Sequence, residues 1–192
     1  ITADEAISRR LAEHYFDPAQ VKFDTIFLRW DEKNVLAQKS PAYTNVSANT
    51  FDRKMISRAK KLGEKSSDWW RQVGAVIVKD GQIIFESHNP HIPSEHLPYI
   101  EGDPRDFIEA GKLSNFSTAL HSEQAVIAEA ARQGIGLDGT RIYVSIFPCP
   151  VCAKLIAYSG IKKCFFGGGH ASLDGERILK TKGVEIVLVK SD

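Results

Sequence analysis

The second half of the chain alternates between helix-like and strand-like hydrophobic patterns. Residues 121–133 are mostly small and apolar, which predicts a helix buried nearly all round. Runs of β-branched and aromatic residues predict the strands between the helices. The expected elements are helices at 121–133, 149–159 and 172–182, and strands at 141–147, 162–166 and 184–189. This order predicts an α/β layer with neighbouring parallel strands.

The segment before it has an apolar stripe at helical spacing from Phe51 to Leu62. Asn49 or Thr50 is the expected N-cap, since both side chains accept hydrogen bonds from the first turn. A dense run of β-formers, 73–78, follows, and Asp80-Gly81 is a strong signal for a two-residue hairpin that returns through 82–86. Two antiparallel strands are therefore expected here.

Two regions carry weaker patterns. Residues 1–50 hold a helical pattern at 5–16 and then a turn-rich stretch, so they are expected to be a partly helical N-terminal extension to a main domain at 51–192. Residues 88–118 form a long irregular insertion with four prolines. An insertion of this length inside a domain is usually functional or partly disordered, and a lid is one possibility.

Aromatic and imidazole side chains near this insertion permit two interpretations each. Trp69 and Trp70 could stack a base, but tryptophans more often fill the seam between a helix and a sheet. His88, His91 and His96 could bind a second metal, but uneven spacing and the absence of a nearby cysteine favour polar loop histidines.

Composition narrows the class of protein. The 192 residues carry a formal net charge of +1, so no broad surface for duplex nucleic acid is expected and nucleic acid is an unlikely partner. Three cysteines are too few for a disulfide scaffold and favour a reducing, cytoplasmic compartment. No apolar run approaches the ~20 residues of a membrane span, and the polar, acidic start does not look like a secretory signal.

Candidate chemistry is concentrated in two short motifs, His121-Ser122-Glu123 and Pro148-Cys149-Pro150-Val151-Cys152. One imidazole and two thiolates form the kind of ligand set that zinc prefers, and three protein ligands leave the fourth tetrahedral position for water. Glu123, two residues after the proposed ligand, is placed to move protons at that water. Both motifs fall at expected helix starts, where the helix dipole favours negative charge.

A structural zinc site is the main alternative for these motifs. It would need a fourth cysteine or histidine, and only Cys164 and His170 are near in sequence. Cys164 lies within an expected strand and is more simply a small core residue. The catalytic interpretation is therefore preferred.

Together the motifs match H-x-E … P-C-x-x-C, the established signature of zinc nucleobase deaminases. The chain resembles the cytidine-deaminase superfamily over about residues 51–190, and within it most closely the zinc-dependent deoxycytidylate (dCMP) deaminase family. Further matching segments are Val73-Gly74-Ala75-Val76-Ile77-Val78, Asn89, Cys152-Ala153-Lys154, Ser159-Gly160-Ile161 and Gly175-Glu176-Arg177-Ile178-Leu179-Lys180.

The resemblance implies a three-layer α/β/α fold with a five-stranded mixed sheet (cytidine deaminase-like) and one catalytic Zn²⁺. It maps the zinc ligands onto His121, Cys149 and Cys152, and the proton shuttle onto Glu123. It also implies that Asn89 contacts the sugar hydroxyl and that the Ser122 backbone N–H faces the pyrimidine carbonyl. Members of the family are commonly homo-oligomers.

The implied activity is hydrolytic deamination of a cytosine nucleotide, most simply dCMP to dUMP with release of ammonia. Three alternatives stay open: a deaminase of a free nucleoside, base or other amino-heterocycle, a non-catalytic deaminase-fold binding module, and action on RNA or single-stranded DNA. A mononucleotide needs a phosphate anchor. The candidates are Lys65, Arg71, Arg105, Lys112, Lys154 and His170.

Overall fold

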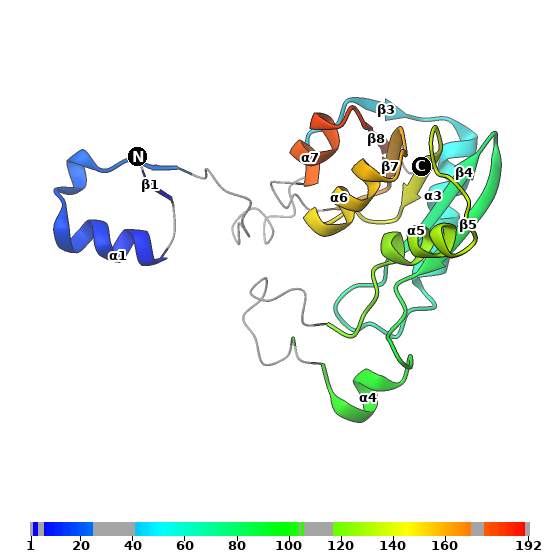
Figure 1. Ribbon diagram of the computed structural model, residues 1–192, viewed down its shortest axis with the longest axis horizontal. Coiled ribbons are helices and arrows are strands. Elements are labelled where there is room, and N and C mark those ends of the chain that lie inside the picture. The colour runs from blue at the N-terminus through cyan, green and yellow to red at the C-terminus, as the bar shows by residue number, and fades with distance from the viewer. Residues whose placement is uncertain are drawn as a thin grey trace.

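A computed structural model describes residues 2–3, 6–24, 41–103, 105, 117–169 and 175–190 (Figure 1). Its centre is a six-stranded mixed sheet with the strand order β3-β8-β7-β6-β4-β5. The strands are β3 (Asn45–Ser47), β4 (Gly74–Lys79), β5 (Gln82–His88), β6 (Arg141–Val144), β7 (Lys163–Phe166) and β8 (Glu185–Val189).

The directions of the strands agree with the sequence pattern. The β4 strand pairs antiparallel with β5 and β6, whereas β6, β7, β8 and β3 run parallel to one another. Asp80 and Gly81 both have positive φ, 49° and 78°, as the tight hairpin between β4 and β5 requires. The expectation of a mixed α/β sheet is thus confirmed.

The sheet has six strands rather than the expected five, because β3 adds to its edge beside β8. This three-residue strand lies in the stretch expected to belong to the N-terminal extension. Its sequence, Asn-Val-Ser, is too short to show an alternation of apolar and polar positions. Backbone pairing with β8 alone makes it a strand.

Helices cover both faces of the sheet. One face carries α5 (Ser122–Arg132), α6 (Pro150–Tyr158) and α7 (Gly175–Thr181), and the other carries α3 (Thr50–Gly63) (Figure 1). The core is correspondingly divided in two. Val126, Ile156 and Leu179 belong to the cluster under α5, α6 and α7, while Met55 and Ala59 belong to the cluster under α3. The three-layer α/β/α expectation is confirmed.

Local signals place α3 as the sequence predicts. The Asn49 side chain caps the helix by accepting a 2.7 Å hydrogen bond from the Phe51 N–H. Asp52 in the first turn accepts hydrogen bonds from the Tyr143 hydroxyl (2.7 Å) and the Ser47 hydroxyl (2.5 Å). A buried carboxylate with two donors joins the helix to β6 and β3.

The two ends of the insertion after β5 lie side by side and are joined by backbone hydrogen bonds. The Ile92 N–H donates to the Thr118 carbonyl (2.9 Å), and the Leu120 N–H donates to the Pro90 carbonyl (2.8 Å). A short helix, α4 (Leu97–Glu101), lies between them (Figure 1). Within the expected insertion, residue 104 and residues 106–116 lie outside the described residues.

The described N-terminal residues form α1 (Ala6–Tyr15), a 3-10 turn at Pro18–Gln20, and the short parallel pair β1 (Thr2–Ala3) and β2 (Phe23–Asp24). β1 and β2 pair with each other in a separate two-stranded sheet. The partly helical character of the segment is as expected, and the division of the chain at residue 50 stays a prediction. No helix within the described ranges is long and apolar enough to cross a membrane.

Candidate active site

The two motifs meet at the beginnings of two neighbouring helices. His121 is the N-cap of α5 and Cys149 is the N-cap of α6, both in extended backbone conformation. The Gln124 side chain accepts a 2.9 Å hydrogen bond from the His121 backbone N–H and so fixes the entry to α5. Cys152 lies in the first turn of α6, one helical turn after Cys149.

The distances within this group fit one zinc ion. His121 Nδ1 lies 3.5 Å from Cys149 Sγ and 3.3 Å from Cys152 Sγ. All three ligand atoms lie within 4.8 Å of one another. With bonds of about 2.3 Å to sulfur and 2.0 Å to nitrogen, tetrahedral zinc separates its ligand atoms by about 3.5 Å. The residues present are therefore already at the spacing of a metal site.

The charges of His121, Cys149 and Cys152 also favour binding of a cation. A hydrogen bond from Cys152, together with one from His121, lowers the pKa of Cys149 to about 4. The neighbouring Cys149 sulfur and burial raise the pKa of Cys152. Two sulfurs close together thus share one proton when no cation is bound. A divalent ion stabilises both as thiolates.

Glu123 lies beside the metal group and is almost completely buried, with 3% of its surface exposed. Burial raises the pKa of its carboxyl, and the negative charge of Cys149 raises it further. The Ser122 hydroxyl donates a 3.2 Å hydrogen bond to Glu123 Oε2. A carboxyl that protonates easily next to a metal site is suited to accept and return protons.

The two proposed substrate contacts, Ser122 and Asn89, differ in what their polar groups already bind. Ser122 is the first residue of α5, so its backbone N–H has no partner within the helix and can face a ligand. The Asn89 side chain is buried and already hydrogen bonded to backbone: Oδ1 accepts from the Val73 N–H and Nδ2 donates to the Arg71 carbonyl, both at 2.8 Å. One amide hydrogen of Asn89 stays available for a sugar hydroxyl.

The histidines of the insertion do not gather into a second metal site among the described residues. His88 pairs with Glu95 at 2.6 Å, and His91 Nδ1 lies 2.7 Å from the Thr118 hydroxyl. His96 precedes α4 and makes no side-chain cap. His91 is also buried, with Nε2 3.6 Å from Asp68 Oδ2, so two of these histidines are engaged with side chains of the same region.

The tryptophan pair does not fill a seam, contrary to the preferred expectation. Trp69 is 52% exposed and packs edge-on against Tyr99, and Trp70 is 48% exposed with the Arg105 guanidinium 5.9 Å from its ring centroid. The cause is the turn at Asp68, whose Oδ1 accepts from the backbone N–H groups of both Trp70 (2.7 Å) and Arg71 (2.8 Å). That turn leaves both indoles at the surface.

The six possible phosphate anchors differ in whether the structure relates them to the metal group. Lys112 and His170 lie outside the described residues, and Lys65 and Lys154 are exposed. Arg71 and Arg105 interact electrostatically with the metal group, Arg71 with Cys149 and Arg105 with His121. Among the described candidates, an electrostatic interaction with the metal group is thus found for these two arginines.

Sequence reasoning missed the importance of Asp68. This buried carboxylate holds the turn at Trp70 and Arg71 through Oδ1, and Arg105 Nη2 donates to its Oδ2 at 2.8 Å. An Asp in the polar stretch Ser66-Ser67-Asp68 is a signal for a side-chain-stabilised turn. The link to Arg105, distant in sequence, had no such signal.

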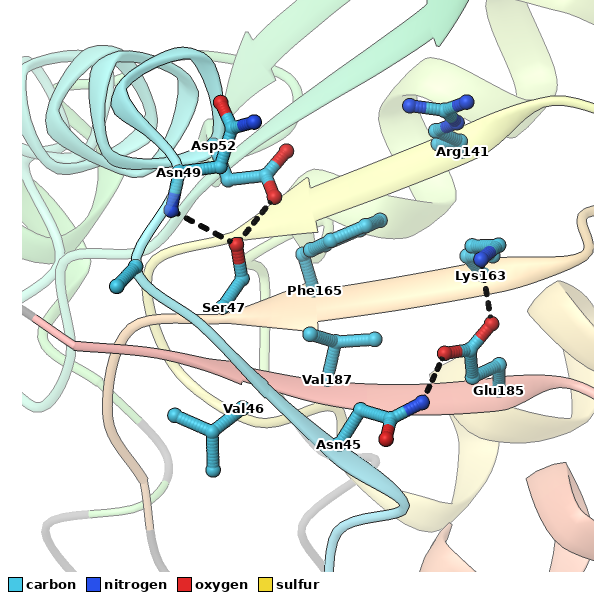
Figure 2. A pocket seen from close by; sticks show the side chains of 11 residues that line it. Asn45, Val46, Ser47, Asn49, Asp52, Arg141, Lys163, Phe165, Glu185 and Val187 are labelled. Atoms are coloured by element: carbon cyan, nitrogen blue, oxygen red, sulfur yellow. Dashed lines mark hydrogen bonds and ion pairs between the residues drawn. The ribbon is translucent and has the colours of Figure 1, made fainter.

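A cavity of about 400 Å³ lies away from the metal group, on the α3 face of the sheet between α3 and β3 (Figure 2). Most of its polar side chains are paired with one another: Lys163 with Glu185 (2.6 Å), Asn45 with Glu185 (2.6 Å) and Ser47 with Asp52. Arg141 lines the cavity as well. Satisfied polar pairs of this kind serve the packing of the sheet edge.

Three protein ligands with a buried carboxyl beside them are the arrangement of zinc enzymes that activate water. Fold and site thus define the class, a zinc-dependent hydrolase built on an α/β/α sandwich. The chain belongs to the family described as the cytidine and deoxycytidylate deaminase zinc-binding region, whose model matches residues 49–168. The expected family and its zinc cofactor are confirmed.

Similar proteins come from more than one branch of this family. Deoxycytidylate deaminases of Enterobacteria phages T2 and T4 are 32% and 30% identical over 156 residues, covering 64% of this chain and 82% and 80% of theirs. A tRNA-specific adenosine deaminase of Bacillus subtilis is 31% identical over 120 residues, 61% of this chain and 59% of its own.

Among solved structures, the dCMP deaminase of cyanophage S-TIM5 superposes with a TM-score of 0.56 at 25% identity, covering 71% of this chain and 95% of the other. The same enzyme in complex with dCMP and dUMP gives a TM-score of 0.55 at 25% identity, over 69% and 92% of the two chains.

Proposed function

We propose that this chain catalyses hydrolytic deamination of a cytosine nucleotide, dCMP and water giving dUMP and ammonia. The observation that carries the proposal is the buried Glu123 carboxyl beside the His121, Cys149 and Cys152 group. A purely structural metal site has no use for a buried carboxyl whose pKa is raised. That argues against the non-catalytic module.

The roles of the residues follow from this arrangement. His121, Cys149 and Cys152 would hold zinc, which when bound supplies the Lewis acidity that makes water a nucleophile at neutral pH. Glu123 takes one proton from the attacking water and delivers it to ring N3. It then takes the proton of the new C4 hydroxyl and delivers it to the amine, which leaves as ammonia. The Ser122 N–H would orient the pyrimidine carbonyl, and Asn89 the sugar.

A nucleotide substrate is supported by the relatives. The similar proteins of phages T2 and T4 are deoxycytidylate deaminases, and one structure of the S-TIM5 enzyme contains dCMP and dUMP. Two arginines within electrostatic reach of the metal group agree with an anionic substrate.

A second candidate, adenosine in RNA, has one observation in its favour. Trp69 and Trp70 are exposed close to these arginines, and exposed aromatic side chains with neighbouring cations can stack unpaired bases. A tRNA-specific adenosine deaminase is also among the similar proteins. The near-zero net charge of the chain counts against a large nucleic-acid surface.

Ammonia release by the zinc-loaded protein separates these possibilities. The panel is dCMP, CMP, deoxycytidine, cytosine, dCTP, guanine and an RNA hairpin with an unpaired adenosine. We expect the highest kcat/KM for dCMP. Ammonia from free bases alone, or from the RNA alone, would contradict the nucleotide proposal.

Glu123→Gln tests the chemistry in the same assay. The variant should keep its zinc and lose about 10²–10⁴-fold in kcat, because an amide cannot carry the protons. Normal turnover by this variant would show that another group carries them.

A further inference from the structure

The backbone of Arg71 is held on both sides by buried polar side chains. Its N–H donates to Asp68 Oδ1 at 2.8 Å, and its carbonyl accepts from Asn89 Nδ2 at 2.8 Å. Asp68 is 3% exposed and Asn89 is 5% exposed. Because two buried side chains hold the backbone of this exposed residue, the position of the Arg71 Cα, from which the long side chain extends, is fixed.

The same stretch of chain is tied to the loop that carries the first zinc-ligand cysteine. Three residues after Arg71, the Gly74 N–H donates to the Ser145 hydroxyl, and the Ser145 N–H donates to the Gly74 carbonyl, both at 3.0 Å. Ser145 follows the end of β6 and precedes Cys149 by four residues. Arg71 accordingly interacts electrostatically with the Cys149 sulfur.

The two arginines near the metal group differ in their counter-charges. Arg105 Nε donates to both oxygens of Asp103, at 2.9 and 3.0 Å, and its Nη2 donates to Asp68. Two buried carboxylates thus neutralise its charge. Burial lowers the pKa of Arg71 and Asp68 acts on it electrostatically to raise it. Among the described residues, however, no carboxylate oxygen is hydrogen bonded to the Arg71 guanidinium, and both oxygens of Asp68 accept from other groups.

From these contacts, resting on the proposed function, we infer that Arg71 binds the 5′-phosphate and makes the site specific for a monophosphate over a nucleoside. A guanidinium whose N–H groups are not hydrogen bonded to a carboxylate can donate two parallel hydrogen bonds to a phosphate. Asp68 is then a positioning residue, because it fixes the Arg71 backbone and withdraws Arg105 from the substrate.

Arg71→Gln is the direct test, with Arg132→Gln as its matched control. Arg132 is an exposed arginine on α5, paired with Glu129. For each zinc-loaded protein, kcat/KM is measured for dCMP and deoxycytidine, and calorimetry gives the affinity for dUMP and deoxyuridine. The binding ratio decides the matter if deoxycytidine turnover is too slow to measure.

We expect Arg71→Gln to lose roughly ten- to a hundredfold in kcat/KM for dCMP and in affinity for dUMP, the range for losing charged hydrogen bonds. Its handling of deoxycytidine and deoxyuridine should stay close to wild type. Arg71→Lys should recover part of the loss, because it keeps the charge but not the fork of donors. Arg132→Gln should leave every value unchanged.

Asp68→Ala tests the positioning role, because it removes the acceptor of the Arg71 N–H. It should reduce the preference for dCMP over deoxycytidine through KM, with little change in kcat for either substrate. An equal loss on both substrates would mean that Asp68 acts on the fold alone and would overturn this part of the inference.

The inference and the proposed function fail in different ways. If the wild type deaminates dCMP and Arg71→Gln keeps the wild-type ratio of dCMP to nucleoside, the inference is wrong and the function stands. If the zinc-loaded wild type releases no ammonia from any cytosine nucleotide, the function is wrong and the inference falls with it.

Discussion

Cys149 and His121 occupy the same position on two different helices, the N-cap, and Cys149 Sγ lies 3.5 Å from His121 Nδ1. The contact joins the beginnings of α5 and α6. A metal held there therefore links two helices that pack on the same face of the sheet.

Cys149→Ser should remove both the metal and the stability that it contributes. At free zinc a hundred times the dissociation constant, binding adds about 2.7 kcal/mol to the stability, or roughly 5–10 °C in melting temperature. Metal analysis and thermal melting with and without a chelator check this. Cys164→Ala, which changes a buried cysteine outside the group, should keep its zinc. Full zinc content in Cys149→Ser would contradict the ligand assignment.

Gly74→Ala should be strongly destabilising. A Cβ at this position would lie 2.0 Å from the Ala59 carbonyl oxygen of α3, so the helix must move away from the sheet. Overpacking costs about 1–3 kcal/mol, and more where the obstacle is backbone. Gly136→Ala is the matched control, because a Cβ there meets nothing within 4 Å. Urea unfolding of both variants checks the difference, and equal midpoints would contradict the close packing of α3.

Tyr143→Phe should lower stability without affecting the metal group. The variant leaves the buried Asp52 carboxylate without one of its donors, at a cost of about 1–3 kcal/mol. The pair lies on the α3 face, away from α5 and α6. Tyr158→Phe removes a hydroxyl from an exposed tyrosine and should be neutral. Loss of zinc from Tyr143→Phe would show that the two faces are coupled.

Arg105→Gln should destabilise the fold in a pH-dependent way. It removes the hydrogen-bonded cation of Asp68 and Asp103, although His91 Nε2 stays 3.6 Å from Asp68 Oδ2. Breaking a buried pair costs about 3–5 kcal/mol, and we expect the lower end because Arg105 is partly exposed. Arg105 lowers the pKa of the Asp103 carboxyl, whose contribution is present above the ordinary value of about 4 and lost as the pH falls through the folded value.

The difference between wild type and Arg105→Gln should therefore be largest near pH 7 and shrink as the pH falls below about 4. Denaturant unfolding at several pH values measures it. A difference that does not change with pH would mean that Arg105 stabilises the insertion by packing rather than by charge.

Local patterns in the sequence were sufficient to predict the metal chemistry and most of the architecture. The placement of one histidine and two cysteines at helix starts can be predicted from local signals: helix caps, glycines that end helices, and the spacing of hydrophobic residues. These signals lie within a few residues of the ligands. The hairpin at Asp80-Gly81 and the cap at Asn49 are local in the same way. The roles of Asn89 and Ser122 in substrate binding stay predictions, as does assembly into oligomers.

Other features arise from contacts between residues that are far apart in the sequence, and local patterns do not predict them. The β3 strand exists only because β8 pairs with it, and the tryptophans are exposed because Asp68 turns the chain. The contrast between Arg71 and Arg105 has the same origin. Both are arginines in polar sequence, and only the positions of Asp68 and Asp103 show that the Arg105 guanidinium is the one hydrogen bonded to carboxylates.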